Sequence, residues 1–243
     1  TMVNKVAWIT GAGSGIGEAS AVKLAAEGFS VVLSGRTKGT LDTVASKCKG
    51  QVSVKPLDVS NHEDVKAVFE EIISDYGRVD VLVASAGLNA KNRNWHNVSE
   101  EDFDQIIKID LNGVFYTNRL VLEKMKEQRE GLIINISSWA GKYVTTLTGP
   151  AYTAAKHGVN ALTEGINMEA GHFGVRACAL CPGEVATPIL DKRPIPVSKE
   201  DKEKMVQPED CAETVAFLAK PPPRVCINEI TISPTWNRLY VAG

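Results

Sequence analysis

A tyrosine and a lysine in the second half of the chain have the spacing that proton-transfer chemistry needs. Tyr152 and Lys156 are four residues apart at the start of a helical pattern, and this spacing places two side chains on one helix face, about one turn apart. The lysine charge favours the phenolate form, so the pair could exchange a proton with one oxygen atom. Ser138, after an apolar run, could hold that oxygen. A lone tyrosine would more often be a core or interface residue, but Lys156 favours the chemical interpretation.

A glycine-rich loop near the start of the chain could bind the phosphates of a cofactor. The apolar run Val6 to Ile9 is followed at once by the sequence TGAGSGIG, which opens a helical pattern. Glycines permit a tight turn and close approach of the backbone to a pyrophosphate, and a helix N-terminus presents free N–H groups to the anion. A strand before the loop and a helix after it are the context that dinucleotide binding requires. We therefore predict cofactor contacts from Gly11, Gly13, Ser14, Gly15, Ile16 and Gly17.

These residues must be positioned by an alternation of strand-length apolar runs and helix-length amphipathic segments. Most runs are continuous in Val, Ile, Leu and Ala, which is typical of strands buried on both faces of a parallel sheet. The predicted fold is α/β: a single-domain, Rossmann-type, doubly wound parallel sheet of about seven strands with helices on both faces, over residues 1–243. The predicted strands are 6–9, 31–33, 52–57, 81–84, 132–136, 175–181 and 227–232, and the predicted helices are 15–27, 38–48, 61–76, 100–128, 151–173 and 208–219.

The composition argues against several classes of function. The formal net charge is -2, with 44% hydrophobic and 23% charged residues, so neither nucleic acid nor a membrane is an expected partner. The four scattered histidines have no metal-ligand spacing, and no metal site is predicted. The five cysteines form no disulfide framework, and Cys178 and Cys181 are interpreted as buried apolar residues rather than a redox pair. Without a secretory pattern or an apolar run of about 20 residues, a cytoplasmic location is expected.

One irregular segment, residues 188–207, interrupts the alternation. It is rich in Lys, Glu, Asp and Pro, and it follows the end of a predicted strand. Two interpretations remain open: a solvated surface loop, or a substrate lid over a site at the carboxyl ends of the strands.

The motifs together resemble the classical short-chain dehydrogenase/reductase family, of the 3-oxoacyl-reductase or carbonyl-reductase type. The resemblance runs from about residue 4 to residue 190 and, more loosely, to the last predicted strand. The family's glycine loop, Tyr-x-x-x-Lys pair, strand-end serine and helix asparagine are matched by Thr10, Gly11, Gly15, Gly17, Tyr152, Lys156, Ser138 and Asn112. Further matches after the third, fourth and sixth strands are Asp58, Val59, Ala86, Gly87, Pro182, Gly183, Val185 and Thr187.

The resemblance implies an oxidoreductase that moves a hydride between a nicotinamide cofactor and a small carbonyl or alcohol substrate. Tyr152 would be the general acid in reduction and the general base in oxidation, and Lys156 would also bind the nicotinamide ribose. Ser138 would hold the substrate oxygen, and Asn112 would anchor a water that joins Lys156 to solvent. The remaining cofactor contacts would come from Asp58, Val59, Ala86, Gly87, Pro182, Gly183, Val185 and Thr187.

Cofactor choice is predicted from the end of the second strand. An acidic residue there would bind the ribose hydroxyls of NAD(H), whereas an arginine would attract the 2′-phosphate of NADP(H). Where NAD-preferring relatives carry aspartate, this chain has Gly35, followed by Arg36. We therefore predict NADP(H) over NAD(H), with Ser34, Arg36 and Thr37 near the phosphate. The alternative is that Arg36 is an exposed loop cation.

The chain also departs from the family pattern. Ala84-Ser85 stands where the family usually has two asparagines, and the segment from Ser138 to Tyr152 is one residue longer than expected. The extra residue leaves open whether Ser137 or Ser138 faces the substrate, and Ser138 is favoured as the second serine of the matching pair. Aromatic candidates for the pocket wall are Trp95, Trp139 and Tyr143.

Two other functions share part of this pattern. A non-catalytic dinucleotide-binding or redox-sensing module would need the glycine loop but not Asn112, Ser138, Tyr152 and Lys156. An epimerase or dehydratase of the extended relatives would need a larger C-terminal substrate domain than the chain has after Pro182. The segments 100–128 and 151–173 resemble the family's dimer-forming helices, so a homodimer or homotetramer is expected. The identity of the substrate is not predicted.

Overall fold

Seven parallel strands form one sheet, and the cavity described below lies at the edge where the strands end. The computed structural model describes residues 4–240; residues 1–3 and 241–243, the ends of the predicted domain, lie outside the described residues. The strands pair in the order β3-β2-β1-β4-β5-β6-β7, all in parallel. The predicted fold class is therefore confirmed. The strands are β1 (Val6–Thr10), β2 (Ser30–Ser34), β3 (Val52–Val54), β4 (Val81–Ala84), β5 (Gly131–Ile136), β6 (Val175–Pro182) and β7 (Glu229–Ile232).

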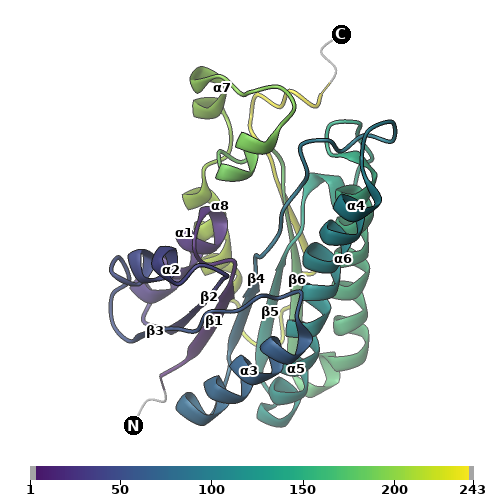
Figure 1. Cartoon of the computed structure of the whole chain (residues 1–243). Helices are drawn as coiled ribbons and strands as arrows, with labels where there is room; N and C mark the ends of the chain where they lie inside the picture. Colours follow the sequence, from purple (N-terminus) through teal and green to yellow (C-terminus); the bar gives the residue numbers. More distant parts are fainter. Residues whose placement is uncertain (1–3, 241–243) are drawn as a thin grey trace.

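Helices cover both faces of the sheet (Figure 1). One face carries α1 (Gly15–Ala26), α2 (Lys38–Ala45) and α8 (Pro208–Leu218), and α1 packs directly on α8. The other face carries α3 (His62–Tyr76), α4 (Glu100–Ile107), α5 (Gly113–Gln128) and α6 (Gly149–Ala170). Short 3-10 turns span Trp139–Gly141, Gly171–Phe173 and Pro188–Lys192. No helix within residues 4–240 combines the length and the apolar character needed to cross a membrane.

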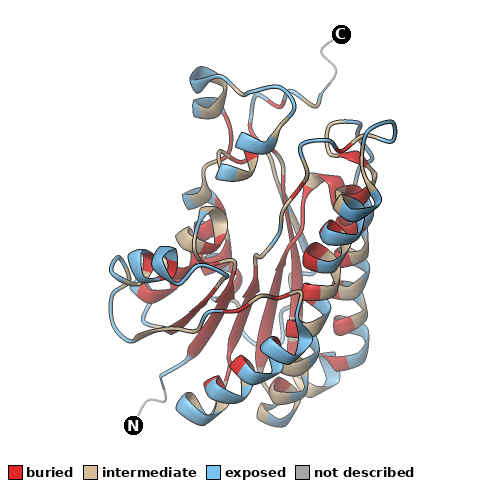
Figure 2. Ribbon diagram, in the orientation of Figure 1, coloured by how far each residue is buried: buried red, intermediate tan, exposed pale blue. Residues whose placement is uncertain are grey.

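The hydrophobic core lies on both faces of the sheet, which explains the continuous apolar strand sequences. Along β1, Ala7 and Ile9 pack toward α1 and α8, whereas Val6 and Trp8 pack toward the layer of α3, α5 and α6. Figure 2 shows the central strands buried along their length. A buried indole N–H needs an acceptor, and Nε1 of Trp8 donates to Oγ of Ser34 at 2.9 Å. Ser34 is thereby part of the core.

The helix predicted over 100–128 is interrupted. A π-helical turn, Lys108–Asn112, separates α4 from α5, and such turns are rare and often lie at functional sites. Gly113 follows the turn, and a Cβ there would lie only 2.7 Å from Cγ2 of Val59. Glycine thus lets α5 approach the loop after β3, while the π turn changes which side chains face the sheet edge.

Residues 188–207 lead away from the sheet and return to it, and we call this segment the excursion. Backbone pairing joins the residues at its two ends. Val185 and Val206 form a parallel bridge, and the N–H of Val206 donates to the carbonyl of Glu184 at 3.1 Å. Between these ends lies a short helix that the sequence analysis does not predict, α7 (Lys199–Lys204), capped by Ser198 Oγ. In Figure 1 the excursion lies beyond the carboxyl ends of the strands.

Candidate active site

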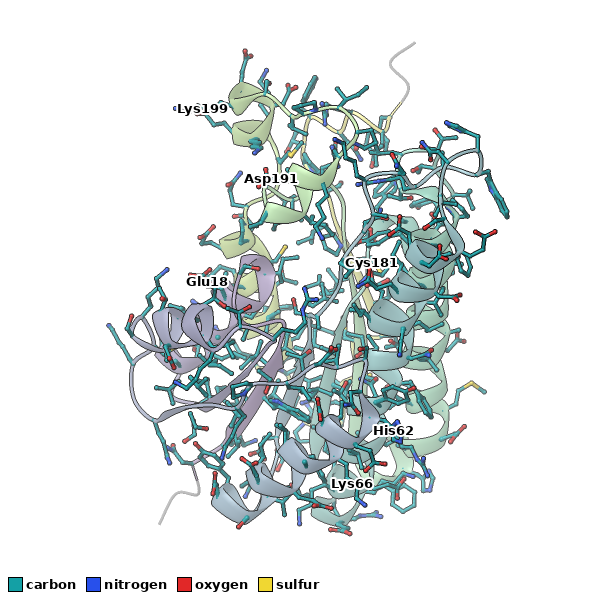
Figure 3. All side chains as sticks on the ribbon, in the orientation of Figure 1. Glu18, His62, Lys66, Cys181, Asp191 and Lys199 are labelled. Carbon is teal, nitrogen blue, oxygen red and sulfur yellow. The ribbon has the colours of Figure 1, made fainter. Side chains whose placement is uncertain are left out.

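A cavity of about 520 Å³ opens at the carboxyl edge of the sheet. Its walls come from the glycine-rich loop after β1, the end of β5, the first turns of α6 and the segment after β6. In Figure 3 the labelled Cys181 marks the end of β6, and the labelled Asp191 marks the excursion above it. This is the location that a doubly wound sheet predicts for a ligand.

The start of α6 carries Tyr152 and Lys156 into the cavity, and both side chains line it. Nζ of Lys156 lies 5.4 Å from the centroid of the Tyr152 ring. Lys156 is buried, and its Nζ donates a hydrogen bond of 3.0 Å to the carbonyl oxygen of Ile136, the last residue of β5. A buried ammonium needs such acceptors to offset its lost hydration. The lysine is therefore fixed between the strand end and the tyrosine.

The two serines after β5 make different contacts. Oγ of Ser137 donates to the carbonyl oxygen of Lys156 at 3.3 Å and so links the strand end to α6. Oγ of Ser138 accepts a bond of 3.1 Å from the backbone N–H of Ala140. Because a hydroxyl can accept and donate at once, Ser138 keeps its proton for an oxygen atom in the cavity. The geometry favours Ser138 over Ser137 for that contact.

The residue that the helices bring to Lys156 is Asp110 rather than Asn112. Asn112 is only half-buried and does not line the cavity. Asp110 lies inside the π turn and is fully buried, with Oδ1 accepting a bond of 2.9 Å from the N–H of Leu88. A Cβ on Gly87 would lie 3.3 Å from Oδ2 of Asp110 and 3.6 Å from Nζ of Lys156. Asn112 therefore does not line the cavity itself, and its role of anchoring a water that joins Lys156 to solvent stays a prediction.

Burial dominates the electrostatics of Asp110. Loss of hydration raises the pKa of its carboxyl from 3.8 to about 6, although the charge of Lys156 and the hydrogen bond from Leu88 act in the opposite direction. Its Oδ2 has no hydrogen-bond partner within residues 4–240. A negative charge is thus held next to the lysine at a cost in folding free energy at neutral pH.

The glycine loop fits close contact with a phosphate group. Gly11 has φ +62°, and a Cβ there would lie 2.6 Å from the backbone nitrogen of Ala86, so only glycine lets the loops after β1 and β4 meet. Gly17 is buried against the carbonyl of Gly11 and does not line the cavity, so its predicted cofactor contact is replaced by a packing role. The other predicted loop residues do line it: Gly11, Gly13, Ser14, Gly15 and Ile16.

The end of β2 contributes two of its three predicted residues. Arg36 and Thr37 line the cavity and are exposed, whereas Ser34 is fully buried and accepts the hydrogen bond from Trp8. The prediction for Ser34 is therefore wrong, because strand alternation turns its side chain into the core. Thr40, which the sequence analysis does not single out, also lines the cavity, and a Cβ on Gly13 would lie 2.6 Å from its Oγ1.

The remaining predicted cofactor residues all reach the same cavity. Asp58 lies on the side of Arg36: burial opposes its ionisation, but hydrogen bonds from Ser60 and the charge of Arg36 prevail and hold the pKa of the carboxyl below its usual value. The carboxylate therefore stays available as a hydrogen-bond acceptor. The cavity is also lined by Val59, Ala86, Gly87, Pro182, Gly183, Val185 and Thr187.

The substrate end of the cavity is closed by loops that hydrogen bonds hold together. Nδ2 of Asn89 donates to the carbonyl of Thr148 at 3.0 Å, and Nδ2 of Asn94 donates to the carbonyl of Thr146 at 2.7 Å. Of the three aromatic candidates, Trp139 lines the cavity. The other two do not: Tyr143 packs outward against Trp139, and Trp95 is 86% exposed.

Comparison with known proteins identifies the family. Residues 5–195 match the family described as short chain dehydrogenase. The chain belongs to the short chain dehydrogenase family. It is 36% identical over 236 residues to an uncharacterized oxidoreductase of Staphylococcus aureus (strain USA300), a match that covers 96% of this chain and 98% of the relative.

Solved structures resemble this short-chain dehydrogenase along nearly its whole length. One is an alcohol dehydrogenase from the archaeon Thermococcus sibiricus complexed with 5-hydroxy-NADP, with a TM-score of 0.87, 32% identity and coverage of 98% of this chain and 99% of that chain. Another is a 3-ketoacyl-(acyl-carrier-protein) reductase from Brucella melitensis complexed with NADH, with a TM-score of 0.86, 31% identity and coverage of 96% and 98%. The chain is therefore an oxidoreductase of this family, and its relatives hold both kinds of cofactor.

In this short-chain dehydrogenase a buried glutamate joins the cavity wall to the excursion. Oε2 of Glu184 accepts from Arg193 at 2.6 Å and from Arg238 at 2.8 Å. Burial opposes ionisation of Glu184, but the two arginines prevail and hold the pKa of the carboxyl below its usual value. Arg238 also pairs with Asp201 at 3.3 Å. The sequence offers no spacing signal for this network, because its members come from distant segments.

The substitution Asp110→Asn tests the buried carboxyl in this short-chain dehydrogenase. The pKa of Asp110 is raised in the folded state, so its stability contribution is intact below about pH 4 and is lost as the pH rises through about 6. We expect the variant's gain in unfolding free energy over the natural protein to grow by about 1.4 kcal/mol between about pH 5 and about pH 8. Urea unfolding at the two pH values measures it.

Asp104→Asn is the matched control, because it removes an exposed carboxylate six residues earlier in the same helical segment. Its effect on stability should be the same at both pH values. A gain for Asp110→Asn that does not grow with pH would contradict the raised pKa.

Proposed function

We propose that this short-chain dehydrogenase transfers a hydride between NADP(H) and a carbonyl or alcohol substrate, with Tyr152 as the general acid and base. The observation that carries the proposal is that Ser138, Tyr152 and Lys156 line the same cavity as the glycine loop. Residues that follow β1 and β5 and residues at the start of α6 thus converge on one cavity. A bound nicotinamide cofactor would supply the hydride.

Each side chain has a chemical role that follows from its contacts. The hydroxyl of Ser138 acts only as an acceptor in its bond from the N–H of Ala140, so its proton remains to be donated to a substrate oxygen. Tyr152 would give its proton to that oxygen in reduction and take it back in oxidation. The ammonium of Lys156, fixed by the carbonyl of Ile136, favours the phenolate that forms when Tyr152 loses its proton.

The residues that line the cavity fit a dinucleotide along its whole length. The loop Gly11 to Gly15 leads into the N-terminus of α1, where backbone N–H groups favour a pyrophosphate. The carboxylate of Asp58 is available at the adenosine end, and Thr187 at the opposite end packs close to Gly15.

The preference for NADP(H) rests on Arg36. It is an exposed cation that lines the cavity directly after Gly35, and no acidic side chain follows β2 at this point. A guanidinium recognises a phosphate through charge-assisted hydrogen bonds. Thr37 and Thr40 flank it with hydroxyl groups.

The excursion 188–207 is proposed as the substrate lid, within a single catalytic and cofactor-binding domain. Pro188, Leu190 and Arg193 line the cavity, and the Glu184 network holds the excursion over its opening. A segment fixed at its base by the Val185–Val206 bridge can cover a substrate without disturbing the sheet.

Replacing Tyr152 with phenylalanine tests the mechanism. The cavity shape is kept and the transferable proton is lost, so kcat should fall about 100-fold to 10,000-fold. NADPH oxidation with a panel of ketones, 3-oxoacyl esters, sugars and steroids measures the rate, and circular dichroism checks the fold. Tyr143→Phe, outside the cavity, is the control and should keep its rate. A Tyr152→Phe variant with most of its hydride-transfer rate would refute the proposal.

Arg36→Asp tests the cofactor preference. The natural protein should use NADPH with a higher kcat/KM than NADH. The kcat/KM of the variant with NADPH should fall about 10-fold to 100-fold, because a carboxylate repels the 2′-phosphate. Lys38→Asp makes the same charge change on an exposed lysine outside the cavity and should keep the ratio. A clear preference for NADH that Arg36→Asp leaves unaltered would contradict the assignment of NADP(H) as the preferred cofactor.

A homodimer or homotetramer is proposed through the outer faces of α5 and α6. Phe115 on α5 is 44% exposed and Met168 on α6 is 78% exposed. Light scattering should give two or four times the chain mass of 26.2 kDa, and Phe115→Glu should shift the mass toward the monomer, because burying a charge at an apolar contact is unfavourable. Ile195→Glu on the excursion is the control. A monomeric natural protein would exclude the assembly.

A further inference from the structure

Arg93 is a buried cation without a counter-ion. It lies in the loop between β4 and α4, is only 5% exposed, and lines the cavity near Tyr152. Among residues 4–240 the structure gives it no ion pair, although many lysines and arginines on the surface have one. Burying a charge without an opposite charge is costly. Keeping such a charge in the cavity therefore indicates a functional role for it.

The contacts of Arg93 leave one end of its guanidinium free. Nε donates to the carbonyl of Ala90 at 2.7 Å, and Nη2 donates to the carbonyl of Lys192 at 2.8 Å. These neutral acceptors fix the orientation of the group but do not neutralise it. Nη1 makes no hydrogen bond to any described residue, so its two N–H donors remain for a ligand.

The backbone places Arg93 next to the catalytic tyrosine. Gly149, the first residue of α6, has φ +75°, and a Cβ there would collide with the carbonyl of Arg93. Tyr152 follows three residues later in the same helix. Burial and the charge of Arg193 lower the pKa of the Arg93 guanidinium, while Tyr152 acts in the opposite direction. The guanidinium and the phenol therefore share one electrostatic environment.

The two other guanidinium groups at this end of the cavity are already paired with carboxylates. Arg193 and Arg238 share Glu184, and Arg238 also pairs with Asp201. Two guanidinium groups thus face two carboxylates. The side chain of Lys192 is exposed to water. Beside Tyr152 the buried cations are thus Lys156, which is fixed by the carbonyl of Ile136, and Arg93, whose guanidinium no described carboxylate pairs.

We propose that Arg93 binds the carboxylate of the substrate, so that the protein acts on an oxo acid or the corresponding hydroxy acid. This inference rests on the proposed function, because it assigns the substrate class of the same cavity. A single uncompensated guanidinium with one free end matches a singly charged planar anion. A phosphate ester, with nearly two charges, would leave one of them unmatched.

A purely structural role for Arg93 makes a different prediction. The bonds to Ala90 and Lys192 join the loop after β4 to the excursion, and their loss would disturb every substrate alike. A carboxylate site would instead discriminate between an acid and its neutral ester. The test therefore compares the kcat/KM for an acid with the kcat/KM for its ester in the same variant.

The experiment compares 2-, 3- and 4-oxo acids with their methyl esters, using NADPH and NADH. The natural protein should have the higher kcat/KM for an acid than for its ester. Arg93→Gln should lower this ratio about 10-fold to 100-fold, mainly through KM for the acid. Lys91→Gln, which removes an exposed charge from the same loop, should keep the ratio. Equal losses for acid and ester in Arg93→Gln, or a natural preference for the esters, would overturn the proposal.

A binding measurement separates this proposal from the proposed function. Hexanoate should raise the melting temperature of the natural protein with NADP⁺ more than hexanol does, and Arg93→Gln should remove that difference. The absence of the difference in the natural protein, or a larger shift with inorganic phosphate, would overturn the carboxylate site. Hydride transfer absent for every compound, with the hexanoate effect intact, would instead reject the proposed function and leave the anion site standing.

Discussion

The site depends on the attachment of the first turns of α6 to the end of β5. Nζ of Lys156 donates to the carbonyl of Ile136, and the carbonyl of Lys156 accepts from Ser137. One turn later, Asn160 donates to the carbonyl of Gly141 at 3.0 Å. These bonds fix the helix that carries Tyr152 against the strand that carries Ser138. Ser138 and Tyr152 therefore line one cavity, as the proposed reaction requires.

The charges around this attachment differ in how they are compensated. Lys156 is buried beside the carboxyl of Asp110, and burial raises the pKa of that carboxyl to about 6. Glu184 and Asp201 form a charge-balanced network with Arg193 and Arg238 at the edge of the cavity. Within residues 4–240 the buried guanidinium of Arg93 has no ion pair. In a medium of low effective dielectric constant an unmatched charge acts strongly on a charged ligand, which is the basis of the proposed carboxylate site.

The sequence predicts the parts of the site that depend on short-range spacing. The spacing of four from Tyr152 to Lys156 on a helix, and a glycine loop between a strand and a helix, dictate their own local geometry. Asn112 and Ser34 show the limit. The π turn changes which side chain of the segment 110–112 faces Lys156, and strand alternation directs Ser34 to the indole of Trp8. The π turn is not visible in residue type or spacing, and the sequence does not reveal that a buried indole occupies the hydroxyl of Ser34.

The sequence by itself determined the seven-stranded parallel fold, the order of its elements and the spacing that puts Tyr152 and Lys156 on one helix face, because apolar periodicity and local spacing carry that information. Only the tertiary structure decided that Asp110 accompanies Lys156, that Glu184 links the excursion to the cavity wall, and that Arg93 is left without a counter-ion. Those facts depend on which distant segments meet and on how far water is excluded between them. Burial and charge pairing are properties of the folded chain as a whole.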